Sequence, residues 1–133
     1  MSQKQPQDLQ VRTKEFALRI IRLYTALPKT TEAQVLGKQV LRSGTSVGAH
    51  YREAQRAKSD ADFINKIEGG LQELDETVYW LELLIESGIV MEERLNPLCQ
   101  ETEELIAIFV TIVKNIKGKG PTKGRGFHPP SVK

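Results

Sequence analysis

The segment that decides the fold is residues 42–54, RSGTSVGAHYREA, which combines glycines and hydroxyl side chains with no proline. Such a segment could form a phosphate-binding loop, a nucleophile site or part of a helix. The surrounding apolar residues favour the helix, because at about 100° per residue they fall within about 60° of arc on one helical face. These residues are Ala33, Leu36, Val40, Val47 and Ala54. The stripe keeps its phase across both glycines of the segment, so the sequence predicts one continuous helix over residues 31–57.

Three further segments repeat apolar side chains at helical spacing, and they cover residues 8–27, 60–87 and 92–116. In the third helix the predicted core stripe consists of Phe63, Ile67, Leu71, Leu74, Val78, Leu81 and Ile85. No segment alternates with the period of two that marks a strand, and the connections are short enough for antiparallel neighbours. The sequence therefore predicts an all-α protein, folded as an antiparallel up-down-up-down four-helix bundle.

Local signals place the ends of these helices. Thr31 and Ser59 are the expected N-caps, and Gly88 is expected to end the third helix. Asn96-Pro97 resembles an N-cap followed by proline at the first helical position, so the regular part of the fourth helix is expected to begin there. The predicted organisation is a flexible N-terminus at residues 1–7, the bundle at residues 8–116 and a basic, disordered tail at residues 117–133.

Gly37, Gly44 and Gly48 lie together on one strip of the second helix, beside its core stripe. Each glycine costs a helix about 1 kcal/mol relative to alanine, so a compensating contact is expected. Missing side chains along one strip let another backbone approach closely. The sequence leaves two neighbours open for this close packing, a helix of the same bundle or another subunit.

Formal charge is unevenly distributed along the chain. Residues 1–58 hold 11 Lys and Arg against 4 Asp and Glu, whereas residues 59–116 hold 3 against 13. Three interpretations of the basic half stay open: a solvated face, neutralisation by the acidic half within one bundle, and a surface that contacts the phosphates of a nucleic acid. The candidate phosphate-contacting residues are Arg12, Arg19, Arg22, Lys38, Arg42, Arg52, Arg56 and Lys58.

Apolar side chains exceed what one bundle needs. Residues 78–90, VYWLELLIESGIV, are apolar almost all around the helix, whereas a helix of a lone bundle keeps one side polar. Surplus apolar surface marks an interface, so homo-oligomerisation is expected, against the alternative of a larger monomeric core. The expected interface residues are Leu18, Ile21, Tyr79, Trp80, Leu83 and Leu84.

The sequence offers no catalytic constellation, and the protein is not expected to be an enzyme. Residues 44–48, GTSVG, match neither a dinucleotide-binding pattern nor a P-loop, and His50 lies about 10 Å along the helix from Ser43. His50 is expected to be a satisfied helix residue. Two histidines and one cysteine give poor support to a metal site, and no cofactor is expected. No apolar run spans a bilayer and the N-terminus lacks a signal sequence, so a cytoplasmic protein without membrane contact is expected.

A long motif in this chain resembles a bacterial family. Residues 41–54, LRSGTSVGAHYREA, and residues 58–84, KSDADFINKIEGGLQELDETVYWLELL, resemble the four-helix-bundle proteins named for the intervening sequences of 23S rRNA genes. The resemblance spans about residues 12–117, and His50 departs from the asparagine that is commoner at its position. The positions that match the family motif include Arg42, Ser43, Gly44, Gly48, Tyr51, Arg52 and Glu53.

This resemblance implies a four-helix bundle that assembles into a ring, commonly a homopentamer, and it supplies no catalytic residues. The chain is also similar to the accessory variability determinant of diversity-generating retroelements, a pentameric barrel that binds nucleic acid and a reverse transcriptase. The leading expectation is therefore a non-catalytic, homo-oligomeric protein that binds RNA or DNA through a basic surface, largely independent of sequence. The alternative is an accessory scaffold subunit that binds a reverse transcriptase in a diversity-generating retroelement.

Overall fold

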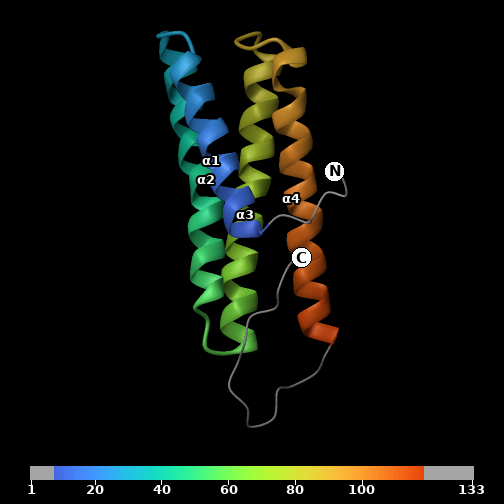
Figure 1. The fold of residues 1–133 in the computed structure, drawn as a ribbon. Helices are drawn as coiled ribbons and strands as arrows, with labels where there is room; N and C mark the ends of the chain where they lie inside the picture. The colour runs from blue at the N-terminus through green and yellow to red at the C-terminus, as the bar shows by residue number, and fades with distance from the viewer. Residues whose placement is uncertain (1–7, 119–133) are drawn as a thin grey trace.

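The computed structural model describes residues 8–118, which form four α-helices and no strand (Figure 1). The predicted all-α four-helix bundle is confirmed. The first and third connections lie at one end of the bundle, and the second connection lies at the other end (Figure 1). None of the described helices is long and apolar enough to span a membrane. The helices are α1 (Leu9–Ala26), α2 (Thr31–Gln55), α3 (Asp60–Glu86) and α4 (Glu92–Gly118).

The predicted flexible N-terminus, residues 1–7, lies outside the described residues. The predicted basic tail also lies outside them, apart from its first two residues. Lys117 and Gly118 extend α4 by two residues beyond the predicted end of the bundle.

Two of the predicted helix ends are confirmed and one is displaced by a residue. The Ser59 hydroxyl accepts a backbone N–H of the first turn of α3, as an N-cap does. Gly88 ends α3 in the left-handed region, with φ of 78°, which glycine adopts without a steric penalty. The N-cap of α2 is Thr30 and not Thr31, because the Thr30 Oγ1 accepts the N–H of Ala33 at 3.3 Å.

The expectation that α4 begins at Asn96-Pro97 is wrong, because the helix begins at Glu92. Pro97 lies in the second helical turn, where its missing N–H leaves only one carbonyl, that of Glu93, without a helical donor. Burial of Leu95 and Leu98 on either side of the proline anchors this part of the helix to the core.

Buried residues recur at alternating spacings of three and four along the helices, the repeat of coiled-coil packing. In α3 the predicted core stripe differs from the observed buried residues by one position at three places. Leu71, Val78 and Ile85 are only partly buried, and the fully buried seam passes through their preceding neighbours. The physical reason is that the seam includes a glycine and a threonine, which carry no hydrophobic signal. The buried seam of α3 is Phe63, Ile67, Gly70, Leu74, Thr77, Leu81 and Leu84.

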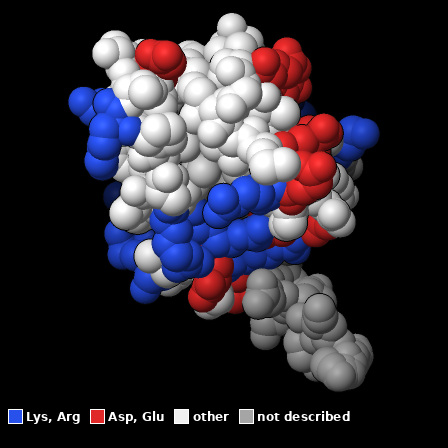
Figure 2. All heavy atoms as spheres, turned by 90° about the horizontal axis from the view of Figure 1, so that it is seen from above, with Lys and Arg blue, Asp and Glu red and all other residues white. Residues whose placement is uncertain are grey.

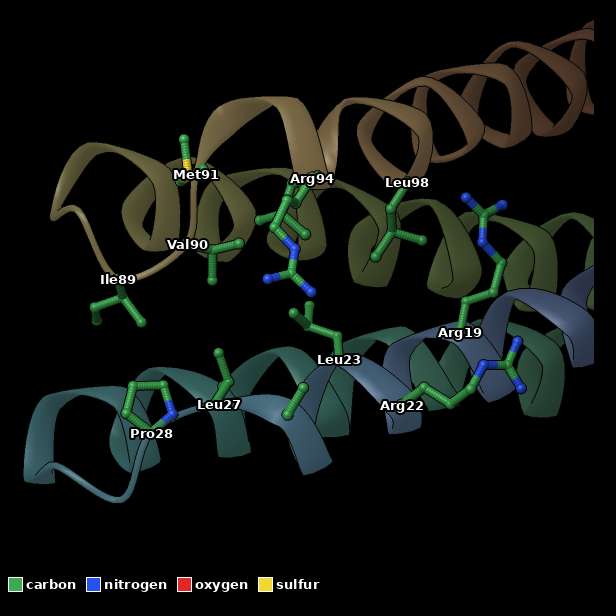
Figure 3. A pocket seen from close by; sticks show the side chains of 12 residues that line it. Arg19, Arg22, Leu23, Leu27, Pro28, Ile89, Val90, Met91, Arg94 and Leu98 are labelled. Atoms are coloured by element: carbon green, nitrogen blue, oxygen red, sulfur yellow. The ribbon is translucent and has the colours of Figure 1, made fainter.

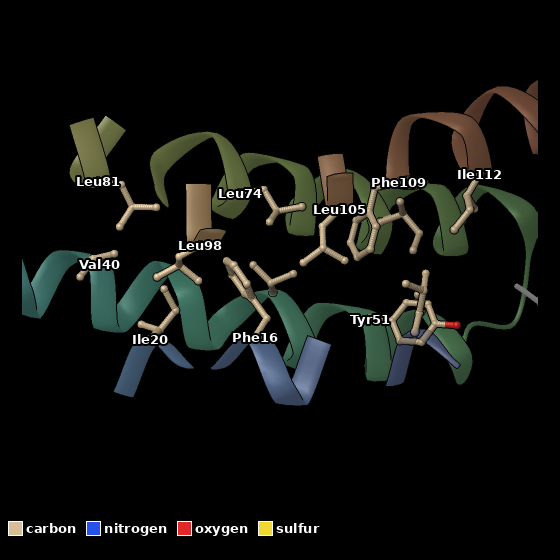
Figure 4. Close-up of a cluster of buried hydrophobic side chains, with 14 of the residues drawn as sticks. Phe16, Ile20, Val40, Tyr51, Leu74, Leu81, Leu98, Leu105, Phe109 and Ile112 are labelled. Carbon is tan, nitrogen blue, oxygen red and sulfur yellow. The ribbon is translucent and has the colours of Figure 1, made fainter. Parts of the chain in front are cut away.

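Packing is strongest between α2 and α3, and each of these central helices carries one outer helix. Residues from all four helices fill the core, including Phe16, Leu74 and Phe109 (Figure 4). The backbones of α1 and α4 approach each other closely at few places, and those of the diagonal pair α1 and α3 at none. The bundle is therefore two helical hairpins that join through α2 and α3, and we call the side where the backbones of α1 and α4 lie farther apart its open side.

The glycine strip of α2 faces α1 of the same chain, so the first of the two open alternatives is the correct one. A Cβ on Gly44 would lie 2.6 Å from the Ile20 Cγ1, and a Cβ on Gly48 would lie 3.2 Å from the Thr13 Oγ1. Gly37 is equally close to side chains at the C-terminal end of α1. All three glycines thus lie where α1 approaches closely, and this contact offsets their cost in helix propensity.

We expect the substitution Gly44→Ala to destabilise the protein by about 1 kcal/mol. Overpacking against the buried Ile20 costs about 1–3 kcal/mol, which exceeds the gain of about 1 kcal/mol in helix propensity. Urea denaturation of the single variants and of the double variant Gly44→Ala/Ile20→Ala measures the coupling. The double variant should be less destabilised than the sum of the two singles.

Additive effects in this cycle would contradict the close contact between Gly44 and Ile20. Gly118→Ala is the matched control, because the added methyl there meets open space. This control variant should keep the stability of the parent protein.

Candidate nucleic-acid interface

The eight candidate cations fall into three groups according to what their side chains touch. Arg12 and Arg42 form ion pairs with acidic residues of α3 and α4. Arg19 and Arg22 line a cavity at one end of the bundle. The other four are exposed and make no ion pair with a described residue, and they are Lys38, Arg52, Arg56 and Lys58.

Arg12 joins α1 to α4 across the open side of the bundle. Its Nε and Nη2 donate to the two carboxylate oxygens of Glu101 at 2.7 and 2.8 Å, and Nη2 also donates to Glu104 at 2.6 Å. The hydrogen bond to Glu101 raises the pKa of Arg12, although burial opposes the shift. The Glu104 pKa is lowered, first by a hydrogen bond from Gln100 and then by Arg12. Arg12 therefore fastens two helices whose backbones approach each other closely at few places.

Arg42 makes the corresponding bridge from α2 to α3. It donates to Glu73 at 3.2 Å and to Glu76, and the bond to Glu76 is the largest cause of the raised Arg42 pKa. The interpretation that the basic half is neutralised by the acidic half holds for Arg12 and Arg42. A phosphate would have to displace carboxylates from both side chains.

A compact set of free cations lies at the C-terminal end of α2. Arg52 and Arg56 are exposed and one helical turn apart, and Lys58 follows in the connection to α3. None of the three makes an ion pair within residues 8–118. We call these three residues the α2 basic cluster. Lys38 is also exposed, but it lies about 21 Å along the helix axis from Arg52 at about 1.5 Å per residue.

Arg19 and Arg22 line a cavity of about 470 Å³ at the end of the bundle that holds the first and third connections (Figure 3). Arg94 of α4 joins them there, and the sequence analysis missed it. The sequence does set Arg94 apart, because it is the only Lys or Arg between Lys66 and Lys114. Seen from this end, Lys and Arg gather in a band along one side of the molecule, while Asp and Glu occupy other parts of the rim (Figure 2).

The expected oligomer interface is only partly available on the surface. Leu18, Ile21 and Tyr79 are 39%, 43% and 53% exposed, whereas Trp80 and Leu83 are half-buried. Leu84 is a correction: it is fully buried in the α3 seam, so it belongs to the core of a single chain. Val11, Val35 and Met91 are also exposed and apolar, although they lie outside the expected interface.

The residues considered for nucleophilic chemistry are separated by the fold. The Ser43 hydroxyl is buried and lies 2.8 Å from the Thr77 Oγ1, with which it shares a hydrogen bond. The expectation that His50 is satisfied is wrong for one ring nitrogen, because the buried Nδ1 has no hydrogen-bond partner among the described residues. The other ring nitrogen, Nε2, lies 3.8 Å from the Glu73 carboxylate. Within residues 8–118 no group of three or more side chains of metal-ligating type is close enough to hold a metal ion.

Comparison with known proteins finds a matching family and a similar fold. The family model described as "23S rRNA-intervening sequence protein" matches residues 7–111. A crystal structure from Bacteroides thetaiotaomicron, described as a protein with unknown function from the S23 ribosomal protein family, is 42% identical in sequence. Its TM-score is 0.76, and the match covers 80% of this chain and 98% of that chain. No curated protein matches this chain.

We expect the substitution Arg12→Gln to lower the free energy of unfolding by about 1.5–3 kcal/mol, the range for hydrogen bonds to charged groups. It removes the bridge to α4 and leaves Glu101 half-buried without a counter-charge. Urea denaturation at neutral pH measures the loss. Lys114→Gln is the matched control, since Lys114 is exposed and makes no ion pair with a described residue.

The loss should also depend on pH. A carboxylate whose pKa is lowered in the folded protein stabilises it above the ordinary pKa of glutamate, and this contribution disappears as the pH falls through the lowered value. Because Arg12 contributes to the lowered Glu104 pKa, the stability difference between the parent and Arg12→Gln should shrink below about pH 4. A difference that stays constant from neutral to acidic pH would show that the pairing of Arg12 with ionised carboxylates does not cause the loss.

Proposed function

Since the chain belongs to the 23S rRNA-intervening sequence protein family, we propose that it is a non-catalytic, homo-oligomeric nucleic-acid-binding protein. In this proposal antiparallel four-helix bundles assemble into a ring, and the family resemblance suggests that the ring has five subunits. RNA or DNA binds through basic surface residues with little regard to sequence. The observation that carries the proposal is the α2 basic cluster, Arg52, Arg56 and Lys58, which is exposed and has no carboxylate partner among the described residues.

The α2 basic cluster suits phosphate contacts better than the other cations do. Arg12 and Arg42 already hold carboxylates, and a phosphate would gain little by competing with a bidentate pair. The cluster offers two arginine forks and a lysine at one helix end, where the cost of desolvation is small. Repetition around a ring multiplies these contacts, so moderate affinity per subunit becomes strong binding overall.

The exposed apolar residues support assembly into a ring. Leu18 and Ile21 lie on α1 and Tyr79 lies on α3, and the backbones of these two helices do not approach each other closely. Each protomer therefore has two different apolar patches. An interface that joins one patch to the other is heterologous, and a heterologous interface closes into a ring when the rotation between neighbours allows it.

We expect the parent protein to bind a fluorescent oligonucleotide with an affinity that falls by about a thousandfold between about 50 and 200 mM salt. The double substitution Arg52→Glu/Arg56→Glu should abolish this binding at low salt, because it reverses the charge of the α2 basic cluster. Fluorescence anisotropy over a salt series measures both effects, and circular dichroism verifies the fold.

Lys14→Glu/Lys114→Glu is the matched control for this experiment. It changes the net charge by the same amount at exposed lysines of α1 and α4 that are outside the candidate set. This control should retain most of the affinity. Equal losses in the two double variants would mean that only net charge matters, and the proposed surface would then be wrong.

We expect the parent protein to be an oligomer in light scattering and the substitution Ile21→Glu to yield smaller species. A charge placed in an apolar contact must be desolvated without a partner, which opposes association. Val35→Glu provides the control, because Val35 is 56% exposed on α2 and lies outside the expected interface. A monomeric parent, or dissociation by both variants alike, would contradict the proposed interface.

Three further expectations stay predictions. The family resemblance suggests a reverse transcriptase as an alternative partner, and co-purification of such an enzyme from the source cells tests it. The absence of catalysis and a cytoplasmic location are expectations that rest on the sequence alone.

A further inference from the structure

We propose that the cavity between the end of α1 and the start of α4 binds an amphipathic anion, a carboxylate or phosphate head carried on an apolar body. This inference goes beyond nucleic-acid binding. It rests on the composition of the cavity wall, which contains three arginines, nine apolar residues and no acidic residue. The combination of a cationic group and a large apolar wall is what such a ligand needs.

The cavity forms because the two hairpins do not close on each other at this end. The α1–α2 connection supplies Leu27 and Pro28, and the α3–α4 connection supplies Ile89 and Val90. Its volume of about 470 Å³ lies within the range of small-molecule sites. An isolated acetate or phosphate would leave most of this space and most of the apolar wall in contact with water.

Three arginines give the cavity its charge. Arg94 points from α4 into the space next to Leu23, and Arg19 points from α1 toward α4 (Figure 3). Arg22 lies one turn along α1 from Arg19. The side chains of the three make no ion pair within the described part of the chain, in contrast to Arg12 and its carboxylate partners.

Unpaired guanidinium groups beside apolar side chains favour an anion. The low dielectric of the apolar wall strengthens the attraction of a nearby charge, and an arginine fork fits the oxygens of a carboxylate or phosphate. An apolar body attached to that head would cover Leu23, Val90 and Leu98, and burial of this surface adds a favourable hydrophobic contribution.

A nucleic-acid backbone does not match this wall, because its phosphates carry sugars rather than an apolar body. Arg94 also lies outside the eight candidate cations of the nucleic-acid surface. The α2 basic cluster lies at the opposite end of the bundle, because α2 runs from the cavity end to the other end (Figure 1). The two sites can therefore be altered separately.

Isothermal titration calorimetry of the full-length protein tests the proposal with sodium decanoate below its micelle concentration. We expect one decanoate per chain, and decyl phosphate should also bind, which shows whether the head can be either anion. Acetate and inorganic phosphate should bind at least about tenfold more weakly, because they lack the apolar body. Decanol and decyltrimethylammonium should be weakened at least as much, because they lack the negative head.

The substitution Arg94→Gln should reduce decanoate affinity by at least about tenfold, the usual effect of losing a charged hydrogen bond. Arg94 is exposed and makes no contact that holds the bundle, so this variant should fold. Equal binding of decanoate and decanol would overturn the proposal, and so would an unchanged affinity in Arg94→Gln.

The same variants separate this proposal from the proposed function. Arg52→Glu/Arg56→Glu should retain decanoate binding while losing nucleic acid, and Arg94→Gln should retain nucleic-acid binding while losing decanoate. A protein that binds nucleic acid and no amphipathic anion would overturn only the cavity assignment. A protein that binds decanoate and no nucleic acid would overturn only the proposed function.

Discussion

The close approach of α1 to the glycine strip of α2 is the contact on which the rest of the structure depends. Gly44 receives the Ile20 side chain at a distance that no larger residue would allow. Because α1 approaches α2 more extensively than it approaches α4, this contact holds the first hairpin together. The hairpin then presents its buried seam to α3 and leaves its basic side chains at the surface. Three separate faces of one helix are thus used at once, for close packing, for the core and for charge.

The sequence contains enough information for the helices but not for the exact phase of their seams. Helical periodicity located α2 and α3 to within two residues, and the cap signals of Ser59 and Gly88 were read correctly. The seam of α3 could not be read correctly, because Gly70 and Thr77 occupy buried positions without being hydrophobic. A stripe predicted from apolar residues then includes their apolar neighbours, Leu71 and Val78, in place of the buried glycine and threonine. The same shift placed Leu84 on the outside, although it is fully buried.

The candidate site was harder to predict, since a charge pattern does not reveal the partners of each charge. Arg12 and Arg42 look like free cations in the sequence, and their carboxylates come from helices 31 or more residues away along the chain. Arg94 stands alone among acidic neighbours in the sequence, and the fold places it in the same cavity wall as Arg19. The α2 basic cluster differs from Arg12 and Arg42, because its three side chains make no ion pair with a described residue.

The alternating spacing of three and four residues along the helices limits how the length of this protein can change in evolution. One residue inserted into the middle of α2 would turn everything beyond it by about 100°, so that glycines, core residues and arginines would exchange places. Seven inserted residues would restore nearly the original orientation. Natural relatives should therefore differ in length at the connections, or by whole heptads added in step to the packed helices.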